Sequence, residues 1–136
     1  MFEPRNFMNV VAHVLGSPDC GGQEFTRTVV GRAYYSAHLV AREYLLGTQR
    51  ISRNKKGRVG HGPVIRALDK GKTEVLASAL DQLMAMRGTA DYDLAAEVPS
   101  EMAQQAKQLA DLVLTRLARN GVPPPATPSP APTAPQ

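Results

Sequence analysis

The stretch from Gln23 to Gly47 constrains the fold most, because it has helical periodicity over 25 residues and follows a break rich in glycine and proline at 17–22. At about 100° per residue, one face carries the side chains expected in a core, namely Phe25, Val29, Ala33, Ser36, Val40 and Tyr44. Gly47 is a plausible C-terminal stop. A helix of this length must bury its apolar face against other elements.

Four further segments have helical patterns, and no segment has a convincing strand pattern. They begin near residues 5, 63, 73 and 100, and they end near 16, 68, 87 and 120. Pro4 suits the first turn of the first helix. Short links between four substantial helices predict an all-α fold, an antiparallel bundle of four to five helices.

The chain divides into a predicted bundle at 1–120 and a tail at 121–136 that holds seven of its eleven prolines. Such a tail cannot bury a core, so we expect it to be disordered. The single cysteine excludes an internal disulfide framework and a cysteine-based zinc site. The sequence has no secretory signal pattern and no apolar run of about 18 residues. We therefore expect a soluble cytoplasmic protein that does not enter a membrane.

Positive charge is concentrated in the middle of the chain. Residues 1–25 sum to −2, residues 26–72 to +9 and residues 73–136 to −3, which gives the overall charge of +4. The densest basic residues lie in a segment rich in Gly, Asn and Ser, namely Arg50, Arg53, Lys55, Lys56 and Arg58. This pattern predicts a flexible basic loop that binds RNA or a nucleotide. The alternative is a loop that is merely solvated.

The non-core face of the 23–47 helix is expected to present Arg32, Tyr35, His38 and Arg42. His38 can act as an acid or base near neutral pH, and Arg32 can stabilise negative charge on a phosphate. Together they suffice for RNA cleavage without a metal or another cofactor, in which the 2′-hydroxyl attacks the neighbouring phosphorus. The alternative is that they are ordinary surface residues.

A second stripe on this helix is partly small and partly apolar, at positions 28, 31, 35, 39, 42 and 46. An ordinary surface helix would be polar there. The pattern therefore predicts a homodimer through the 23–47 helix, packed about a twofold axis. The alternative is that Leu39 and Leu46 contact another element of the same chain.

Three segments resemble HEPN-domain proteins. Arg32-Ala-Tyr-Tyr-Ser-Ala-His38 is similar to that family's Arg-Ala-Tyr-Tyr-Ala-Ala segment, His61-Gly-Pro-Val-Ile65 to its His-Ser-Gly-Val-Ile stretch, and Arg87-Gly-Thr-Ala-Asp-Tyr-Asp93 to its Arg-x-x-Ala-Asp-Tyr element. The resemblance implies a helical bundle, usually dimeric. Many members are metal-independent endoribonucleases that act as toxins or defence effectors. Others bind nucleotides, or pair with a nucleotidyltransferase antitoxin.

The resemblance implies catalytic roles for Arg32 and His38, which are separated by five residues as the family's loose motif allows. In many relatives of this type the histidine comes one residue later, at the position of Leu39 here. One residue rotates a side chain by about 100° on a helix. His61 is a replacement imidazole if its loop packs beside the 23–47 helix. A non-catalytic nucleotide-binding or interaction module is the alternative function.

The remaining candidates are assigned by their surroundings in the sequence. Tyr35, Arg42, Arg53, Lys55, Lys56, Arg58 and His61 are the predicted substrate-binding residues. We expect Arg87 and Asp91 to form a local ion pair and Tyr92 to pack against the 23–47 helix. No zinc-ligand spacing and no Gly-rich phosphate loop is present, so we predict no metal and no cofactor.

Overall fold

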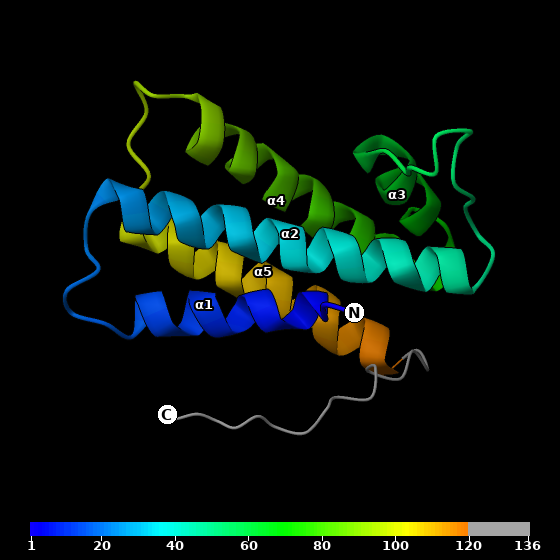
Figure 1. The fold of residues 1–136 in the computed structure, drawn as a ribbon, viewed down its shortest axis with the longest axis horizontal. Coiled ribbons are helices and arrows are strands. Elements are labelled where there is room, and N and C mark those ends of the chain that lie inside the picture. Colours follow the sequence, from blue (N-terminus) through cyan, green and yellow to red (C-terminus); the bar gives the residue numbers. More distant parts are fainter. Residues whose placement is uncertain (120–136) are drawn as a thin grey trace.

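The structure is a computed structural model that describes residues 1–119, and the predicted tail at 121–136 lies outside them. Within the described residues the chain is all-helical, as predicted, and the helices pack against one another in a bundle (Figure 1). The helices are α1 (Phe7–Leu15), α2 (Gln23–Gly47), α3 (His61–Leu68), α4 (Glu74–Tyr92) and α5 (Ser100–Arg119). Single 3-10 turns at Pro4–Asn6 and Gly71–Thr73 precede α1 and α4.

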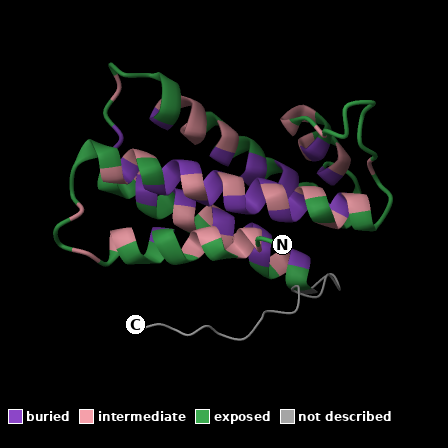
Figure 2. Cartoon of the chain, in the orientation of Figure 1, coloured by how far each residue is buried: buried purple, intermediate pink, exposed green. Residues whose placement is uncertain are grey.

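The central element is α2, which packs against α1 and α5 on one side and against α4 and α3 on the other (Figure 1). The predicted core residues Val29, Ala33, Ser36 and Val40 are buried, whereas Phe25 and Tyr44 are half-buried. A second group on α2 is also buried, and its members are Val30, Tyr34, Ala37, Ala41 and Leu45. Figure 2 shows the buried colour along most of α2. This helix is therefore covered on two sides within one chain.

The C-terminus of α2 is closed by Gln49 and not by the predicted stop at Gly47. Gln49 has a φ of 61°, whereas Gly47 is still helical. The Arg50 N–H donates to the Leu45 carbonyl over 2.8 Å, and the Gln49 N–H donates to the Leu46 carbonyl over 3.1 Å. These two hydrogen bonds form a Schellman motif, with Gln49 at the left-handed position that glycine usually fills.

The C-terminal end of α4 lies at Tyr92, five residues beyond the predicted end at Arg87. Gly88 was expected to lie outside the helix, but it is helical. The physical reason is a contact from α2, because the guanidinium of Arg27 donates to carbonyls at the end of α4 and just after it. Its acceptors are Thr89 (3.3 Å), Ala90 (3.0 Å), Asp93 (3.0 Å) and Ala96.

A second polar contact fixes the connection from α4 to α5. The side-chain amide of Gln23, the first residue of α2, donates to the Val98 carbonyl over 3.0 Å and accepts from the Val98 N–H over 2.9 Å. Val98 itself is fully buried. Arg27 therefore joins the N-terminal part of α2 to the end of α4, and Gln23 joins it to the connection that follows.

None of the helices within residues 1–119 combines the length and the hydropathy that crossing a membrane requires.

Candidate functional site

The three segments that carry the family resemblance meet where α2, α3 and α4 come together. Tyr34, Tyr35 and His38 come from α2, His61 is the first residue of α3, and Arg87 lies on α4. We call these five residues the His61 cluster. Aromatic and cation–π contacts connect all of them, with ring or guanidinium distances between 4.2 and 6.3 Å. The fold therefore brings together residues that are distant in the sequence.

His38 lies at the bottom of the cluster and is only 3 % exposed. The prediction that it projects from a non-core face is wrong, because α3 and α4 cover that face of α2. Its ring stacks on His61 at 4.2 Å and on Tyr34 at 5.6 Å. Burial, followed by the nearby His61, Arg42 and Arg87, lowers the pKa of His38 to about 3. His38 is therefore neutral at pH 7, and its Nδ1 atom is buried without a hydrogen-bond partner in the described residues.

His61 lies above His38 and is half-buried. It packs beside α2, which was the condition for its role as a replacement imidazole, and that role stays a prediction. Its Nδ1 atom is hydrogen-bonded to the hydroxyl of Tyr34. Burial and the charge of Arg87 lower its pKa. The Nε2 atom has no hydrogen-bond partner within residues 1–119 and is not fully buried.

Arg87 joins the cluster to the end of α4. Its Nε atom donates to Asp91 Oδ2 over 2.9 Å, which confirms the predicted ion pair. Its Nη2 atom donates to the hydroxyls of Tyr35 (2.7 Å) and Tyr92 (3.1 Å). Tyr92 is 69 % exposed, so the prediction that it packs against α2 is wrong. The ring of Tyr92 lies at the surface, and its hydrogen bond from Arg87 positions it.

Close packing of α4 on α2 depends on Gly31. A Cβ atom at this position would lie 3.3 Å from Asp91 Oδ1, tighter than an ordinary van der Waals contact. Glycine thus lets the carboxylate of Asp91 approach the backbone of α2 while it pairs with Arg87.

Arg32 does not join His38 within the chain. Its guanidinium lies over the ring of Phe7 in α1 at 5.1 Å and over the ring of Tyr35 at 5.2 Å. His38 instead contacts His61 of α3. The two predicted catalytic side chains therefore have different neighbours, and their catalytic roles stay predictions.

The predicted flexible loop at 48–62 contains an ordered turn. The side-chain oxygen of Asn54 accepts hydrogen bonds from the N–H groups of Lys56 and Arg58, each over 2.9 Å. The Asn54 N–H donates to the Arg58 carbonyl over 2.8 Å, and Gly57 has a φ of 76°. We call residues 53–58 the basic turn. Its side chains Arg53, Lys55, Lys56 and Arg58 are exposed.

Three arginines in or near the basic turn have partners in the neighbouring helices and connections. Arg50 donates to the Ala67 carbonyl of α3 and to the hydroxyl of Thr73. Arg42 pairs with Glu43 over 3.0 Å, and Arg53 approaches the same carboxylate at 3.7 Å. A shallow hollow on α3 and the residues after it is lined by Pro63, Arg66, Ala67, Asp69 and Lys70.

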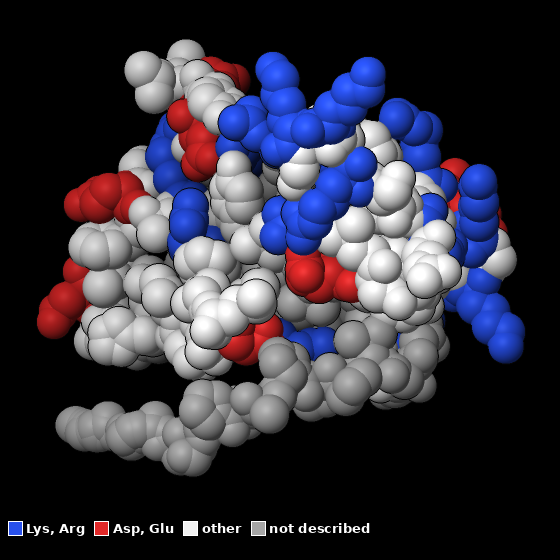
Figure 3. Space-filling view, turned by 45° about the vertical axis from the view of Figure 1, so that its right-hand side comes forward, with Lys and Arg blue, Asp and Glu red and all other residues white. Residues whose placement is uncertain are grey.

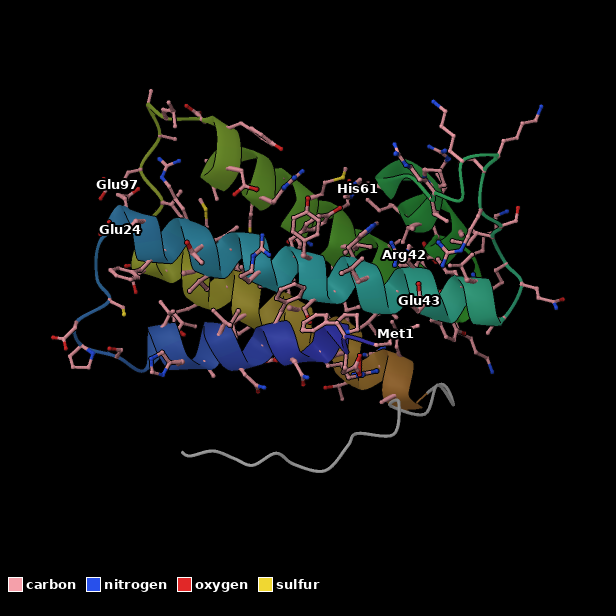
Figure 4. The ribbon with its side chains drawn as sticks, viewed as in Figure 1. Met1, Glu24, Arg42, Glu43, His61 and Glu97 are labelled. Carbon is pink, nitrogen blue, oxygen red and sulfur yellow. The ribbon has the colours of Figure 1, made fainter. Side chains whose placement is uncertain are left out.

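Basic side chains gather on one face of the molecule. Figure 3 shows most of the lysine and arginine side chains of this view over its upper and right-hand part, with some acidic side chains among them and others along the left. Glu24 and Glu97 lie near the N-terminal end of α2, whereas Arg42 lies toward its C-terminal end (Figure 4). His61 lies on the side of α2 that faces α3 and α4, between these two ends (Figure 4).

Sequence reasoning missed the part that Tyr34 takes in the site. Tyr34 is not among the predicted site residues; its side chain is fully buried, and its hydroxyl is hydrogen-bonded to His61. The available signal is the spacing of Tyr34 and His38, because side chains four residues apart lie on the same face of a helix.

Within residues 1–119, no group of three or more His, Cys, Asp or Glu side chains is placed to hold a metal ion. Comparison with protein-family models, with curated proteins and with solved structures gave no match.

Proposed function

We propose that this chain is an RNA-binding protein whose contact surface combines the basic turn at 53–58 with the adjacent face of α3. The observation that carries the proposal is the turn itself, in which Asn54 orders the backbone beneath four exposed cationic side chains. A preformed basic surface loses less conformational entropy when it binds a polyanion than a flexible loop does.

Neighbouring charge supports the same surface. Arg66 and Lys70 line the hollow on α3, and the side chain of Arg50 connects α3 to the loop that carries the turn. Phosphate groups of a nucleic acid would displace counterions from such a surface, so that binding depends strongly on salt. For a single strand that contacts three or four phosphates, the logarithm of affinity should fall with the logarithm of salt with a slope of about −2 to −3.

The geometry favours binding over cleavage by the predicted pair. His38 is buried and neutral, and Arg32 lies against Phe7 and Tyr35. A proton-transfer group must reach the substrate, either directly or through one water. His61 is the accessible imidazole of the cluster, and it lies close enough to Arg87 for that charge to lower its pKa.

The experiment is a titration of a fluorescent single-stranded RNA at several salt concentrations, followed by anisotropy. Lys55→Ala/Lys56→Ala should weaken binding roughly tenfold at low salt and reduce the salt slope by about 1 to 2. The matched control is Lys107→Ala/Arg116→Ala on α5, which removes the same charge and should change affinity less than twofold. Equal losses in both variants would reject the basic turn as the contact surface.

The same RNA, incubated with the protein in a metal chelator, tests the nuclease hypothesis. A metal-independent endoribonuclease leaves 2′,3′-cyclic phosphate ends, and Arg32→Ala and His38→Ala should each abolish their formation. Binding without cleavage would identify a non-catalytic binding module.

A homodimer through α2 remains part of the proposal. Leu39 and Leu46 are half-buried on α2, yet they lie outside the hydrophobic core of the chain. Covering them with a second copy would remove apolar area from water. Light scattering on the purified protein tests this, since Leu39→Glu/Leu46→Glu should convert a dimer to a monomer. A wild-type monomer at high concentration would contradict it.

The cellular role as a toxin or defence effector, paired with a nucleotidyltransferase, rests on the HEPN resemblance alone. Growth arrest on expression, relieved by co-expression of such a partner, is the corresponding test.

A further inference from the structure

The hydroxyl of Tyr34 identifies which nitrogen of His61 carries the proton. Tyr34 is fully buried, and within residues 1–119 its hydroxyl has one hydrogen-bond partner, the Nδ1 atom of His61. Burial raises the pKa of Tyr34 to about 12, so the phenol keeps its hydrogen at neutral pH. If the hydroxyl did not donate to Nδ1, its hydrogen would be buried without an acceptor, which is costly. The hydroxyl therefore donates, and Nδ1 accepts.

A neutral imidazole carries a single hydrogen, on one of its two nitrogens. Since Nδ1 of His61 accepts a hydrogen bond, the hydrogen must be on Nε2. The lowered pKa of His61 makes the neutral ring the main form at pH 7. His38 lies parallel to the ring, with 18° between the planes, and holds its orientation. His61 thus has an N–H donor at Nε2, the nitrogen that is not bound to Tyr34. A general base acting through Nε2 would need this nitrogen unprotonated.

We propose that Tyr34 and His38 hold His61 as the Nε2–H tautomer, so that His61 and Arg87 together donate hydrogen bonds to a phosphate oxygen of the RNA backbone. This inference rests on the proposed function, and it names the chemical group that the His61 cluster recognises. Tyr34 is a positioning residue in this arrangement. His61 is a phosphate ligand and not the base of a nuclease.

The charges around His61 fit an anion. Arg87 uses Nε and Nη2 for Asp91, Tyr35 and Tyr92, and its Nη1 atom has no acceptor within the described residues. The other charged group that acts on the stacked imidazoles is Arg42 of α2. Asp91 is the carboxylate bound to Arg87, and the ion pair offsets its charge. An Nε2 lone pair would repel a phosphate oxygen, whereas an N–H group binds it.

Nitrogen-15 NMR of the three histidine side chains at pH 7.5 tests the tautomer. His61 should show the pattern of a neutral ring protonated at Nε2, with Nδ1 far downfield of Nε2. In Tyr34→Phe, which keeps the buried ring and removes the hydroxyl, the two shifts should move toward each other as both tautomers become populated. Tyr44→Phe is the matched control on α2, because its half-buried ring has a hydroxyl without a hydrogen bond in the described residues. It should leave the His61 signals unchanged.

The phosphate ligand is tested by titrating a short single-stranded RNA, and separately inorganic phosphate, into the same labelled protein. The Nε2 signal of His61 should shift with either probe, while the exposed His13 should not respond. Tyr34→Phe should weaken RNA binding about two- to fivefold, the effect of losing the fixed geometry of one hydrogen bond, and Tyr44→Phe should have no effect.

Two outcomes separate this inference from the proposed function. If the wild-type ring is protonated at Nδ1, the inference is wrong even when the basic turn binds RNA. If RNA does not bind, the proposed function fails, and the titration with inorganic phosphate then decides the inference. A shift of the His61 signal with phosphate in wild type that is smaller in Tyr34→Phe supports the inference. No shift in wild type overturns it.

Discussion

The imidazole rings of His38 and His61 are stacked, with their centroids 4.2 Å apart. One ring is fully enclosed by the fold, and the other forms the surface above it. A proton on either ring would meet incomplete solvation and the positive charge of Arg87. The folded state therefore favours the neutral form of both rings.

Acid should destabilise the protein through His38. The folded state holds its pKa at about 3, below the ordinary value of 6.5, so the unfolded state binds the proton more readily as pH falls below 6.5. The associated stability is present above pH 6.5 and is lost toward pH 3. Between pH 7.5 and pH 5 the loss should be about 2 kcal/mol, and the lowered pKa of His61 adds to it in the same direction.

His38→Leu removes the ionisable ring and its unpartnered Nδ1 atom at nearly constant volume. This variant should lose distinctly less stability than wild type between the two pH values, as measured by urea unfolding at each. His13→Ala, at an exposed position on α1, should keep the wild-type pH dependence. An unchanged pH dependence in His38→Leu would contradict the assignment.

Arg27→Ala should destabilise the protein by about 2–3 kcal/mol, because several carbonyls at the end of α4 lose a charged donor. Urea unfolding measures the loss. Hydrogen exchange should rise most at Asp93, whose N–H closes the last turn of α4. Arg66→Ala, which removes an exposed arginine from α3, should cost less than about 0.5 kcal/mol. Similar costs for the two variants would show that the contacts of Arg27 do not stabilise the fold.

Gln49→Gly should stabilise the protein by about 0.5–1 kcal/mol, because glycine adopts the left-handed conformation without strain. Gly47→Ala should also stabilise it, by about 0.5–1 kcal/mol, since this residue is helical and an added Cβ meets no atom within 4 Å. Thermal unfolding of both variants tests the assignment. A loss of stability in Gly47→Ala would indicate that Gly47, and not Gln49, ends α2.

Asn54→Ala should lower RNA affinity roughly threefold to tenfold, since two backbone N–H groups lose their acceptor and the basic turn loses its fixed shape. Global stability should change little, because the turn is exposed. Anisotropy gives the affinity, and thermal unfolding gives the stability. Ser52→Ala, next to the turn, is the control and should bind as wild type does. Equal RNA affinity for Asn54→Ala and wild type would mean that the fixed shape of the basic turn does not contribute to RNA binding.

Local signals were enough to predict α2 but not the end of α4. The extent of α2 follows from its apolar periodicity and from the break at 17–22 that precedes it, which are properties of the local sequence, although Gln49 and not Gly47 closes the helix. The last turn of α4 depends on Arg27, which lies on another helix, so no pattern near Gly88 could reveal it. Tertiary contacts of this kind override local propensity.

The orientation of His38 was missed for a different reason. We took one stripe of α2 as the core and treated the rest as surface, although Val30, Ala37, Ala41 and Leu45 form a second apolar stripe. Small and apolar residues on two sides of a helix predict burial on both. With both stripes counted, His38 would fall among buried residues, and a neutral imidazole would be the natural expectation.

The basic turn follows the C-terminal end of α2, whereas Glu24 and Glu97 lie near the N-terminal end (Figure 4). In the proposed complex, the positive charge of the basic turn would attract a polyanion before contact forms. The partner should therefore meet the protein preferentially at the basic turn, and the association rate constant should fall steeply as salt screens the charges.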